Sequence, residues 1–491
     1  MRRVFTASTW RADWRMVIAI AALMAVSFYL LVSAGIFRIG FPLDDTWIHL
    51  TYARNLAEHG QWAFRLGQRS AGSTAPLWTF LLGIGFLLKL APYIWTYFLG
   101  WLVLMLLAMY AESTARKLLR AYDPRIPWVG LFFVFAWHLT WSAVSGMETL
   151  LHGYIIFIVL AMLLRGSRRY MILGVLAGLS IWVRPDGMTL LGPILFTAVF
   201  RERGAQSFTE ALGKSLIGFS ALYGPYMLFN LAFSGNPMPN TFYAKQAEYH
   251  AYWTSIPLGE RFTNYLWPFL ASPFLILLPG AIYWLYKRIL ARDYAAIASL
   301  LWFLGYIAIY FLRMPAYQHG RYIIPAFPIM YLWGLLGLLE YASSERATKR
   351  LVLTWQVLVG VFCVLFTFTA ARQNAYDVYW IESEMVQTAK WVQQNIPPDA
   401  LLAVHDIGAL GYYVPNPIID LAGLVSPELV PFIRDSAKLR AYLDSRSADY
   451  LIVFSDQYPG LIAQRTSLFT GGVQPDLLHF DVHIHVYSWK K

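Results

Sequence analysis

Two adjacent carboxylates, Asp44 and Asp45, follow the first long apolar segment of the chain by a few residues. Charge so close to hydrocarbon is costly, so it usually indicates a function. One carboxylate could take the proton from an incoming hydroxyl while its neighbour orients it or holds a cation. A divalent cation, if the chemistry uses one, would bind at this pair. The alternative is a helix cap, because Asp44 precedes a helical pattern over 46–58 and Asp is a favoured N-cap residue.

Three cationic side chains could bind a phosphate group. Arg184, Lys245 and Arg321 each lie close to the end of an apolar segment, and His319 precedes the last of them. Arginine presents a bidentate fork to phosphate oxygens, and lysine presents a point charge. The alternative for each is that it extends to lipid headgroups beside the membrane. Together they suit a phosphate that is linked to a lipid.

Further polar residues could belong to the same site. His49 lies one helical turn beyond Asp45 and could face the same cavity. Glu148 begins an apolar segment and could also belong to the site. The alternative is that its negative charge only stabilises the N-terminus of the helix that begins there. Asp406 and Asp420 come at the ends of short strand-like runs, where α/β folds place functional loops. Each of these two could instead cap a helix.

The composition indicates what must position these residues. The chain has 491 residues, of which 58% are hydrophobic and 14% are charged, whereas a soluble domain carries about 25% charged residues. A membrane protein with many spans is therefore predicted. The net charge of +11 lies mostly in short loops between apolar runs, which is typical of orientation on a membrane and predicts lipid rather than nucleic acid as a partner. The single Cys363 excludes an intrachain disulfide, and the lack of His/Cys spacing argues against zinc.

About eleven spans are predicted from the lengths of the apolar runs. Their ranges are 16–37, 93–112, 127–144, 148–165, 170–184, 187–200, 213–233, 266–286, 294–312, 321–341 and 350–371. The first is interpreted as an uncleaved signal anchor. The run 170–200 is broken at 184–187, so it is either two short helices or one broken helix. The run 76–90 is short for a span and predicts an interfacial helix.

Basic clusters predict the orientation of these spans. They lie at the N-terminus and after the second, fourth, sixth, eighth and tenth spans. The clusters are at 2–15, 116–125, 165–169, 201–214, 287–292 and 346–350. Positively charged loops stay in the cytoplasm. The N-terminus is therefore predicted to be cytoplasmic, and the residues after the eleventh span are predicted to lie outside.

The C-terminal residues lack long apolar runs and alternate helical with strand-like patterns. A helical pattern covers 381–395, and strand-like runs follow at 401–404, 418–421, 450–454 and 482–489. Such alternation predicts a small α/β domain. We therefore predict a helical membrane domain over 1–373, with a first outer loop at about 38–92, and an outer α/β domain over 374–491.

With this topology the polar motifs share the outer face, as expected of a single site. In chain order they lie at 44–45, 52–56, 72–78, 145–149, 184–187, 239–245, 319–322, 406–413 and 420–424. This ordered set resembles the GT-C superfamily of glycosyltransferases, and it is most similar to the cell-wall terminal arabinofuranosyltransferase group. The resemblance covers nearly the whole chain.

The resemblance implies a polyprenyl-phosphate sugar as donor, a cell-envelope glycan or lipid as acceptor, and inverting transfer on the outer face of the plasma membrane. The family's base maps to Asp44, with Asp45 beside it, so Asp44→Asn is expected to abolish transfer. The substrate-binding residues would be His49, Glu148, Arg184, Asn240, Tyr243, Lys245, His319, Arg321, Tyr322, Asp406 and Asp420. Residues 46–50 and 61–64 depart from the group's usual pattern, which leaves the identity of the sugar open; an arabinofuranosyltransferase-like or mannosyltransferase-like activity is one expectation.

A transporter or flippase of a lipid-linked sugar is the main alternative. Transporters place charge near the membrane midplane on broken helices and often contain repeats. Here the motifs gather on one face, and the sequence has no evident internal repeat. A membrane scaffold that presents its outer domain would leave the polar motifs unexplained. The sequence therefore favours a glycosyltransferase.

Overall fold

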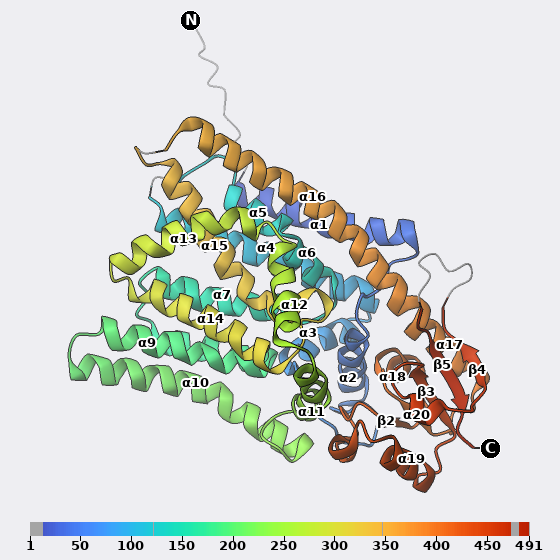
Figure 1. The fold of residues 1–491 in the computed structure, drawn as a ribbon. Helices are drawn as coiled ribbons and strands as arrows, with labels where there is room; N and C mark the ends of the chain where they lie inside the picture. Colours follow the sequence, from blue (N-terminus) through green and yellow to red (C-terminus); the bar gives the residue numbers. More distant parts are fainter. Residues whose placement is uncertain (1–12, 121, 346, 473–480, 491) are drawn as a thin grey trace, which may run out of the picture.

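Helices form most of the chain and collect in one bundle, and a small sheet domain lies at one end of that bundle (Figure 1). The computed structural model describes residues 13–120, 122–345, 347–472 and 481–490. The basic residues Arg2, Arg3, Arg11 and Arg346, which entered the topology prediction, lie outside the described residues.

The helices of the membrane part are numbered in chain order. They are α1 (Trp14–Ile36), α2 (Asp45–His59), α3 (Pro76–Leu87), α4 (Pro92–Leu118), α5 (Trp128–Phe135), α6 (Trp137–Val144), α7 (Thr149–Leu164), α8 (Tyr170–Val183), α9 (Leu191–Arg201), α10 (Ala205–Ser234), α11 (Asn240–Ser255), α12 (Leu258–Leu270), α13 (Phe274–Leu290), α14 (Tyr294–Arg313), α15 (Phe327–Ala342) and α16 (Lys349–Ile381). Short 3-10 helices connect some of them. These are η1 (Pro185–Leu190), η2 (Gln318–Gly320) and η3 (Ile324–Ala326).

Six of the described helical segments are long and apolar enough to cross a membrane, and the bent pair α12–α13 would make a seventh. They contain α1, α4, α10, α14, α15 and α16. The chain is therefore a polytopic membrane protein, as predicted. The number of eleven spans stays a prediction, because several of them correspond to shorter helices than the about 20 residues of a typical span. These shorter helices are α5 with α6, α7, α8 and α9.

Caps and apolar surfaces explain where the long helices begin and what they face. Asp13 accepts a hydrogen bond from the backbone of Arg15 at the start of α1, and Thr348 accepts one from Leu351 at the start of α16. Apolar side chains such as Leu31 are more than half exposed on the bundle surface. In a bilayer these apolar side chains face the lipid hydrocarbon. The backbone N–H and C=O groups behind them bond to each other within the helix, so none is left unpaired in the lipid.

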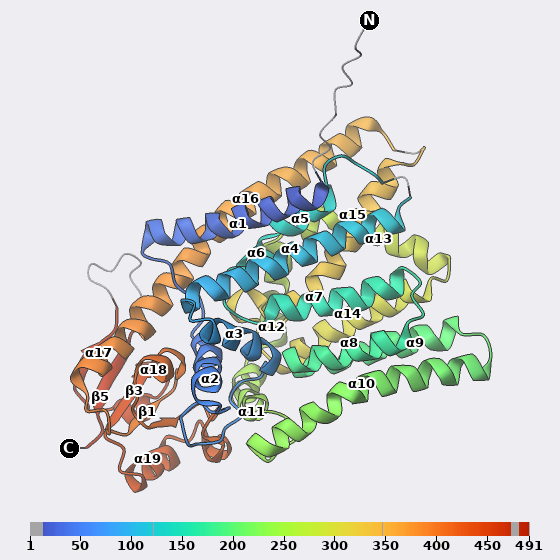
Figure 2. The same cartoon turned by 180° about the vertical axis from the view of Figure 1, so that it is seen from behind.

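The run 76–90, for which an interfacial helix was predicted, forms α3, which has 12 residues. It would rise about 18 Å, less than the about 30 Å of a hydrocarbon core. It lies beside α2, at the end of the bundle that carries the sheet domain (Figure 2). The Trp78 indole donates a hydrogen bond to the carbonyl of Gly146 at 2.9 Å. This bond ties α3 to the loop before α7. The run 170–200 forms two helices, α8 and α9, with η1 between them.

The C-terminal domain is built on one mixed sheet with the strand order β2-β1-β3-β5-β4. β1 pairs in parallel with β2 and β3, whereas β5 is antiparallel to β3 and β4. The strands are β1 (Leu402–Val404), β2 (Ile418–Asp420), β3 (Tyr450–Phe454), β4 (Ser467–Thr470) and β5 (Ile484–Ser488). The helical elements are η4 (Glu382–Val386), α17 (Gln387–Asn395), α18 (Gly408–Tyr413), η5 (Pro427–Phe432), α19 (Ser436–Ser445) and α20 (Pro459–Ile462).

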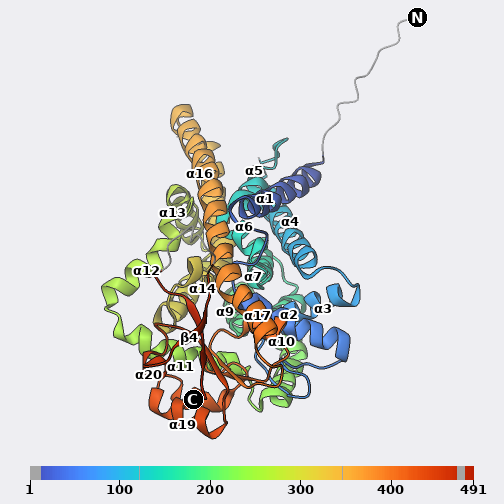
Figure 3. The same cartoon turned by 90° about the vertical axis from the view of Figure 1, so that its right-hand side faces the viewer.

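The predicted helix over 381–395 and the four predicted strands are confirmed as η4 with α17 and as β1, β2, β3 and β5. β4 was missed because it is an edge strand whose residues are all at least partly exposed, so it has no buried apolar run. α16 continues without a break past residue 373 and leads directly into this domain (Figure 3). The C-terminal domain is therefore anchored on the last long helix of the bundle.

Candidate active site

Two cavities meet beside the N-terminus of α2. The first, which we call the membrane cavity, has a volume of about 340 Å³ and lies among α2, η1, α11 and α14. The second, which we call the interdomain cavity, has a volume of about 770 Å³ and lies between α16, α11 and the loops of the C-terminal domain. Both cavities are lined by Asp45, Ile48, Lys245, Arg321 and Leu424. Three of the residues that the sequence singled out therefore lie on their common boundary.

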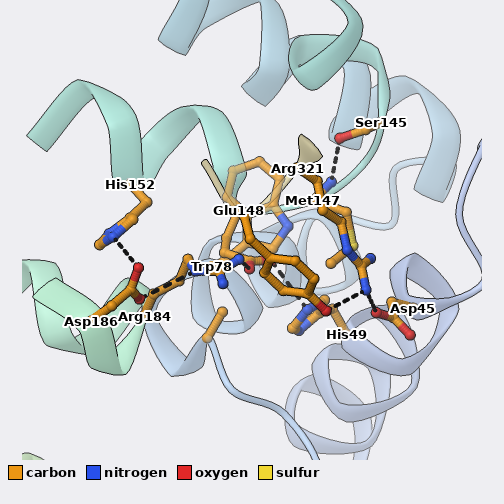
Figure 4. Close-up of polar contacts among 12 residues, drawn as sticks. Asp45, His49, Trp78, Ser145, Met147, Glu148, His152, Arg184, Asp186 and Arg321 are labelled. Atoms are coloured by element: carbon orange, nitrogen blue, oxygen red, sulfur yellow. Dashed lines mark hydrogen bonds and ion pairs between the residues drawn. The ribbon is translucent and has the colours of Figure 1, made fainter. Parts of the chain in front are cut away.

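Asp45 is held between two cations at this boundary. Its Oδ2 accepts hydrogen bonds from the Lys245 ammonium at 3.1 Å and from Arg321 Nη2 at 2.8 Å, and Figure 4 shows the contact with Arg321. Burial would raise the pKa of Asp45, but Lys245 and Arg321 outweigh it and hold that pKa well below its usual range. Asp45 is therefore ionised at neutral pH.

Arg321 is buried and has unused hydrogen-bonding capacity. Its Nη2 serves Asp45 and the Tyr322 hydroxyl, which lies 3.0 Å away. Its Nε and Nη1 have no partner among the residues that the structure describes. A buried charged donor without a partner carries a large desolvation cost. Such a guanidinium, facing a cavity, is suited to receive an anion.

The loop that carries Arg321 is strained. Gln318, His319 and Gly320 have φ values of +51°, +62° and +76°, a conformation that costs about 1–3 kcal/mol for each residue other than glycine. The His319 Nε2 lies 2.7 Å from Asp377 Oδ2 on α16, and this contact holds the loop. His319 itself lines the interdomain cavity and not the membrane cavity. His319 and Arg321 therefore share the interdomain cavity, and Arg321 alone of the two also lines the membrane cavity.

Arg184 lies in the wall of the membrane cavity within a row of alternating charges. It donates to Glu148 at 3.1 Å and to Asp186 at 3.3 Å. His49 Nε2 lies 3.4 Å from Glu148, and His152 Nε2 lies 3.3 Å from Asp186. Figure 4 shows this row, from His49 through Arg184 to His152. Arg184 therefore reaches the cavity with its charge largely balanced by Glu148 and Asp186.

Asp44 is bound to the C-terminal domain. Its two carboxylate oxygens accept hydrogen bonds from the backbone N–H groups of Gly408 at 2.7 Å and Ala409 at 2.8 Å, at the start of α18. It makes no side-chain cap on α2, so the helix-cap alternative is wrong. Burial, followed by the charge of Asp406, raises the pKa of Asp44 to about 7, although the two N–H bonds oppose the shift. Asp44 thus connects α2 to the C-terminal domain at the edge of the interdomain cavity.

Gly408→Ala is expected to loosen this connection. A Cβ at Gly408 would lie 2.1 Å from the Asp44 carbonyl oxygen and 2.5 Å from its Oδ2, and overpacking of this kind costs about 1–3 kcal/mol. We expect a lower melting temperature and faster proteolysis between the two domains. Gly213→Ala in α10 is the matched control, because no atom lies within 4 Å of its Cβ. Equal melting temperatures for the two variants would contradict the prediction.

The other predicted residues divide between the cavities and their surroundings. His49, Glu148 and Tyr322 line the membrane cavity, and Asp406 lines the interdomain cavity.

Asn240, Tyr243 and Asp420 line neither cavity. Asn240 joins α11 to the backbone of Ala71, Tyr243 packs edge-on against Phe242, and Asp420 accepts backbone hydrogen bonds within its own turn. Substrate binding by these three residues stays a prediction, because the structure places none of them in the wall of either cavity.

Several neighbours of the site were missed by sequence reasoning. His152 lies four residues after Glu148, a spacing that places both on one helix face and was an available signal. Glu248 and Asp377 meet histidines that are distant in the chain, and no local pattern indicates such pairs. Among the described residues, no cluster of three or more His, Cys, Asp or Glu side chains is arranged to hold a metal ion.

Comparisons with solved structures identify the architecture. The oligosaccharyltransferase of Archaeoglobus fulgidus in the apo form matches 90% of the chain over 70% of its own length, with a TM-score of 0.59 and 12% identity. ArnT from Cupriavidus metallidurans, solved with undecaprenyl phosphate bound, matches 96% of the chain over 98% of its own, with a TM-score of 0.54 and 14% identity. The mycobacterial arabinofuranosyltransferase AftD matches 96% of the chain over only 40% of its own length, with a TM-score of 0.55 and 14% identity.

These likenesses confirm that the chain has the GT-C fold, as its motifs predicted. Residues 373–485 also match a sequence family described as a domain of unknown function, DUF8728. No curated protein has significant sequence similarity to the chain.

Proposed function

We propose that this membrane protein with a GT-C fold is a glycosyltransferase that moves a sugar from a polyprenyl-phosphate carrier to a hydroxyl group, with Asp45 as the general base. One observation carries the proposal. Asp45 shares its carboxylate with Arg321 and Lys245 at the boundary of two cavities, so an acceptor from one and a donor from the other would meet there. The undecaprenyl phosphate named for ArnT supports a lipid phosphate as carrier.

The membrane cavity suits the phosphate end of such a donor. Apolar side chains, among them Met147, Met188 and Ile309, form much of its wall. Arg321 and Lys245 lie at its boundary with the interdomain cavity. The Nε and Nη1 of Arg321 are buried and have no partner among the described residues. A local movement that exposes them would let them bind phosphate oxygens. The lipid would lie along the apolar wall while its phosphate meets the cations.

The reaction is a single displacement. The acceptor hydroxyl gives its proton to the Asp45 carboxylate, and its oxygen forms a bond with the anomeric carbon. The bond from that carbon to the phosphate oxygen breaks, and its electron pair leaves with polyprenyl phosphate. Arg321 and Lys245 stabilise the charge that builds on the phosphate, which lowers the barrier. Attack opposite the leaving group inverts the anomeric configuration.

Donor binding would also activate the base. Without donor, Lys245 and Arg321 lower the pKa of Asp45 and make it a weak base. A phosphate that engages the same cations would compete with Asp45 for them and raise its proton affinity. The base would then be strongest when the donor is in place, which disfavours futile proton transfer in the empty site.

The two aspartates divide their roles differently from the sequence-based expectation. Both oxygens of Asp44 already accept backbone hydrogen bonds from Gly408 and Ala409. In Asp45, Oδ2 alone is engaged by residues that the structure describes, and these are the two cations that also line the membrane cavity. We therefore assign proton transfer to Asp45, and to Asp44 the placement of the C-terminal domain beside it.

The outer face of the plasma membrane is the proposed location of the reaction. The basic loops predict that the end of the bundle carrying α2 and the C-terminal domain lies outside. α2, α11 and the C-terminal domain are at that end (Figure 1), and they line the two cavities. A substituted-cysteine labelling experiment at Ser445 in α19 would test the orientation, with Cys363 replaced by Ala. Labelling of intact cells by an impermeant maleimide is expected.

The function is tested directly with purified protein in lipid nanodiscs. A panel of polyprenyl-phosphate sugars, including arabinofuranosyl and mannosyl donors, is offered with and without chelator. Release of polyprenyl phosphate from one donor is expected, and an effect of the chelator would reveal a need for a divalent cation. Movement of an intact donor across the bilayer without its cleavage would favour a flippase instead.

Gly305→Leu is expected to impair use of the lipid donor. A third cavity of about 320 Å³ between α9 and α14 shares Thr189 and Ile309 with the membrane cavity and is lined by Gly192 and Gly305. We propose that the polyprenyl tail follows this route. A leucine would fill it, and we expect at least a fivefold rise in the KM for a long-chain donor, of the order expected from about 1 kcal/mol of lost apolar contact.

The control for this prediction is Gly224→Leu in α10. No atom lies within 4 Å of a Cβ at either glycine, so neither substitution should disturb packing. Gly224 lines none of the cavities described above. Equal rises in the donor KM of the two variants would contradict the proposal that the polyprenyl tail lies in the third cavity.

A further inference from the structure

We infer that the acceptor is an uncharged carbohydrate chain, bound from the aqueous side in the interdomain cavity between aromatic and carboxylate side chains. This inference rests on the proposed function, since it names the second substrate of the same site. It excludes two other classes of acceptor, a lipid that enters from the bilayer and a polyanionic glycan.

The walls of the interdomain cavity indicate access from water. Besides the residues around Asp45, it is lined by loops of the C-terminal domain, including His405, Asp406 and Gln457. Its volume of about 770 Å³ falls within the range of about 300–1,000 Å³ that is usual for small-ligand sites. A short run of sugar units is a ligand of this size.

Aromatic side chains supply the flat surfaces that sugar rings need. Trp380 of α16 and Phe454 of β3 are parallel, with ring centroids 5.5 Å apart and an interplanar angle of 7°. Trp141, Tyr249 and Tyr376 line the same cavity from α6, α11 and α16. A sugar ring has apolar C–H faces, which pack against aromatic rings and gain from their burial. The aromatic wall therefore favours a ring with hydroxyls at its rim.

Polar groups at the C-terminal side of the cavity can accept hydrogen bonds from those hydroxyls. Gln457 Nε2 donates to Asp406 Oδ2 at 3.2 Å and thereby fixes the carboxylate. Glu248 Oε1 lies 3.4 Å from His405 Nε2, and the other His405 nitrogen meets the Tyr458 hydroxyl at 2.8 Å. Each group is held in place by a neighbour, so little ordering is needed when a ligand binds.

The charge of the cavity disfavours anions. Six carboxylates line it, against the cations Lys245 and Arg321 and the histidines His319 and His405. Burial would lower the pKa of His405, but the neighbouring Asp406 and Glu248 raise it well above the usual value, so His405 is a third cation. The carboxylates still outnumber the positive charges. Lys245 and Arg321 are already engaged with Asp45 and belong to the proposed phosphate site. Carboxylates accept hydrogen bonds from hydroxyls but repel acidic sugars. An uncharged saccharide is thus the class that these walls fit.

The acceptor class is tested with full-length protein in nanodiscs and with the donor that the panel of polyprenyl-phosphate sugars selects. The candidate acceptors are neutral trisaccharides of glucose, mannose and arabinofuranose, a trisaccharide of galacturonic acid, and a diacylglycerol glycoside in the bilayer. Transfer to at least one neutral trisaccharide is expected, with little or none to the acidic trisaccharide or the glycolipid. Donor cleavage with transfer to the glycolipid, to the acidic sugar or to water alone would overturn the inference and leave the proposed function standing. Failure to cleave any donor would instead count against the function.

A matched pair of tryptophans tests the site itself. Trp380→Ala is expected to raise the KM for the acceptor by about tenfold, a larger change than in the KM for the donor. Trp391→Ala is the control, because Trp391 stacks on Phe469 in the same domain, at 4.8 Å and 15°, and lines none of the described cavities.

Asp406→Asn, which preserves shape, provides a second test if Trp380→Ala fails to fold. It is expected to raise the same acceptor KM. An acceptor KM that changes equally in the Trp391 control, or that stays constant in both cavity variants, would contradict this placement of the acceptor.

Discussion

Asp45→Asn is expected to lower the rate of sugar transfer by about 10²–10⁴-fold, the contribution of a positioned general base. An amide oxygen can still accept from Lys245 and Arg321, whose nitrogens lie 3.1 and 2.8 Å from Asp45 Oδ2, so the cation pair stays in place. The amide cannot take up the acceptor proton at neutral pH. The measurement is release of polyprenyl phosphate by protein in nanodiscs, with melting temperature as the check on folding.

Asp44→Asn is the control that separates the two aspartates. An asparagine oxygen can replace one carboxylate oxygen, but its NH₂ group would face a backbone N–H of Gly408 or Ala409. We therefore expect a lower melting temperature and a smaller loss of activity than with Asp45→Asn. A fully active Asp45→Asn enzyme beside a well-folded, inactive Asp44→Asn enzyme would return the role of base to Asp44.

Arg321→Gln is expected to lower kcat/KM for the donor by about 10²–10³-fold, the loss that follows removal of one group that stabilises the charge of a transition state. The substitution removes both the charge and the two guanidinium nitrogens that have no partner among the described residues. Arg321→Lys keeps the positive charge but loses the bidentate guanidinium, so its kcat/KM for the donor is expected to lie between those of Arg321→Gln and the wild type. Arg446→Gln, at an exposed arginine of α19's C-cap, controls for loss of one positive charge.

The pH profile gives Arg321→Gln a signature that a folding defect would not produce. The cations hold the pKa of Asp45 low against the opposing effect of burial. Loss of one cation raises that pKa, and a base acts only when deprotonated. The acid limb of kcat/KM against pH therefore moves to higher pH in the variant. An unchanged acid limb, or a shift to lower pH, would contradict the pairing of Arg321 with the base.

Local patterns in the sequence predicted the elements of the C-terminal domain. The buried runs of β1, β2, β3 and β5 were recognised because each carries a short apolar signal bounded by polar residues. The edge strand β4 lacks this signal. Likewise, apolar length identified the long helices, but it could not establish how many short helices cross the membrane.

The candidate site was predicted as a set of residues but not as an arrangement. Asp45, Lys245 and Arg321 were each singled out by their residue type, and the structure brings them within hydrogen-bonding distance. Their contacts span 200 and 276 residues of chain. No periodicity reaches across such separations, because it reports only neighbours within one helix or strand.

The sequence by itself determined that the chain is a helical membrane protein with a small C-terminal α/β domain and paired carboxylates after its first span. Apolar length and residue type act locally, so they can be read without coordinates. Only the tertiary structure decided which aspartate faces the cations. Asp44 and Asp45 are adjacent in sequence, but the backbone amides of Gly408 and Ala409 bind the first, and Arg321 and Lys245 bind the second. These partners come from distant segments, and packing alone brings them to the start of α2.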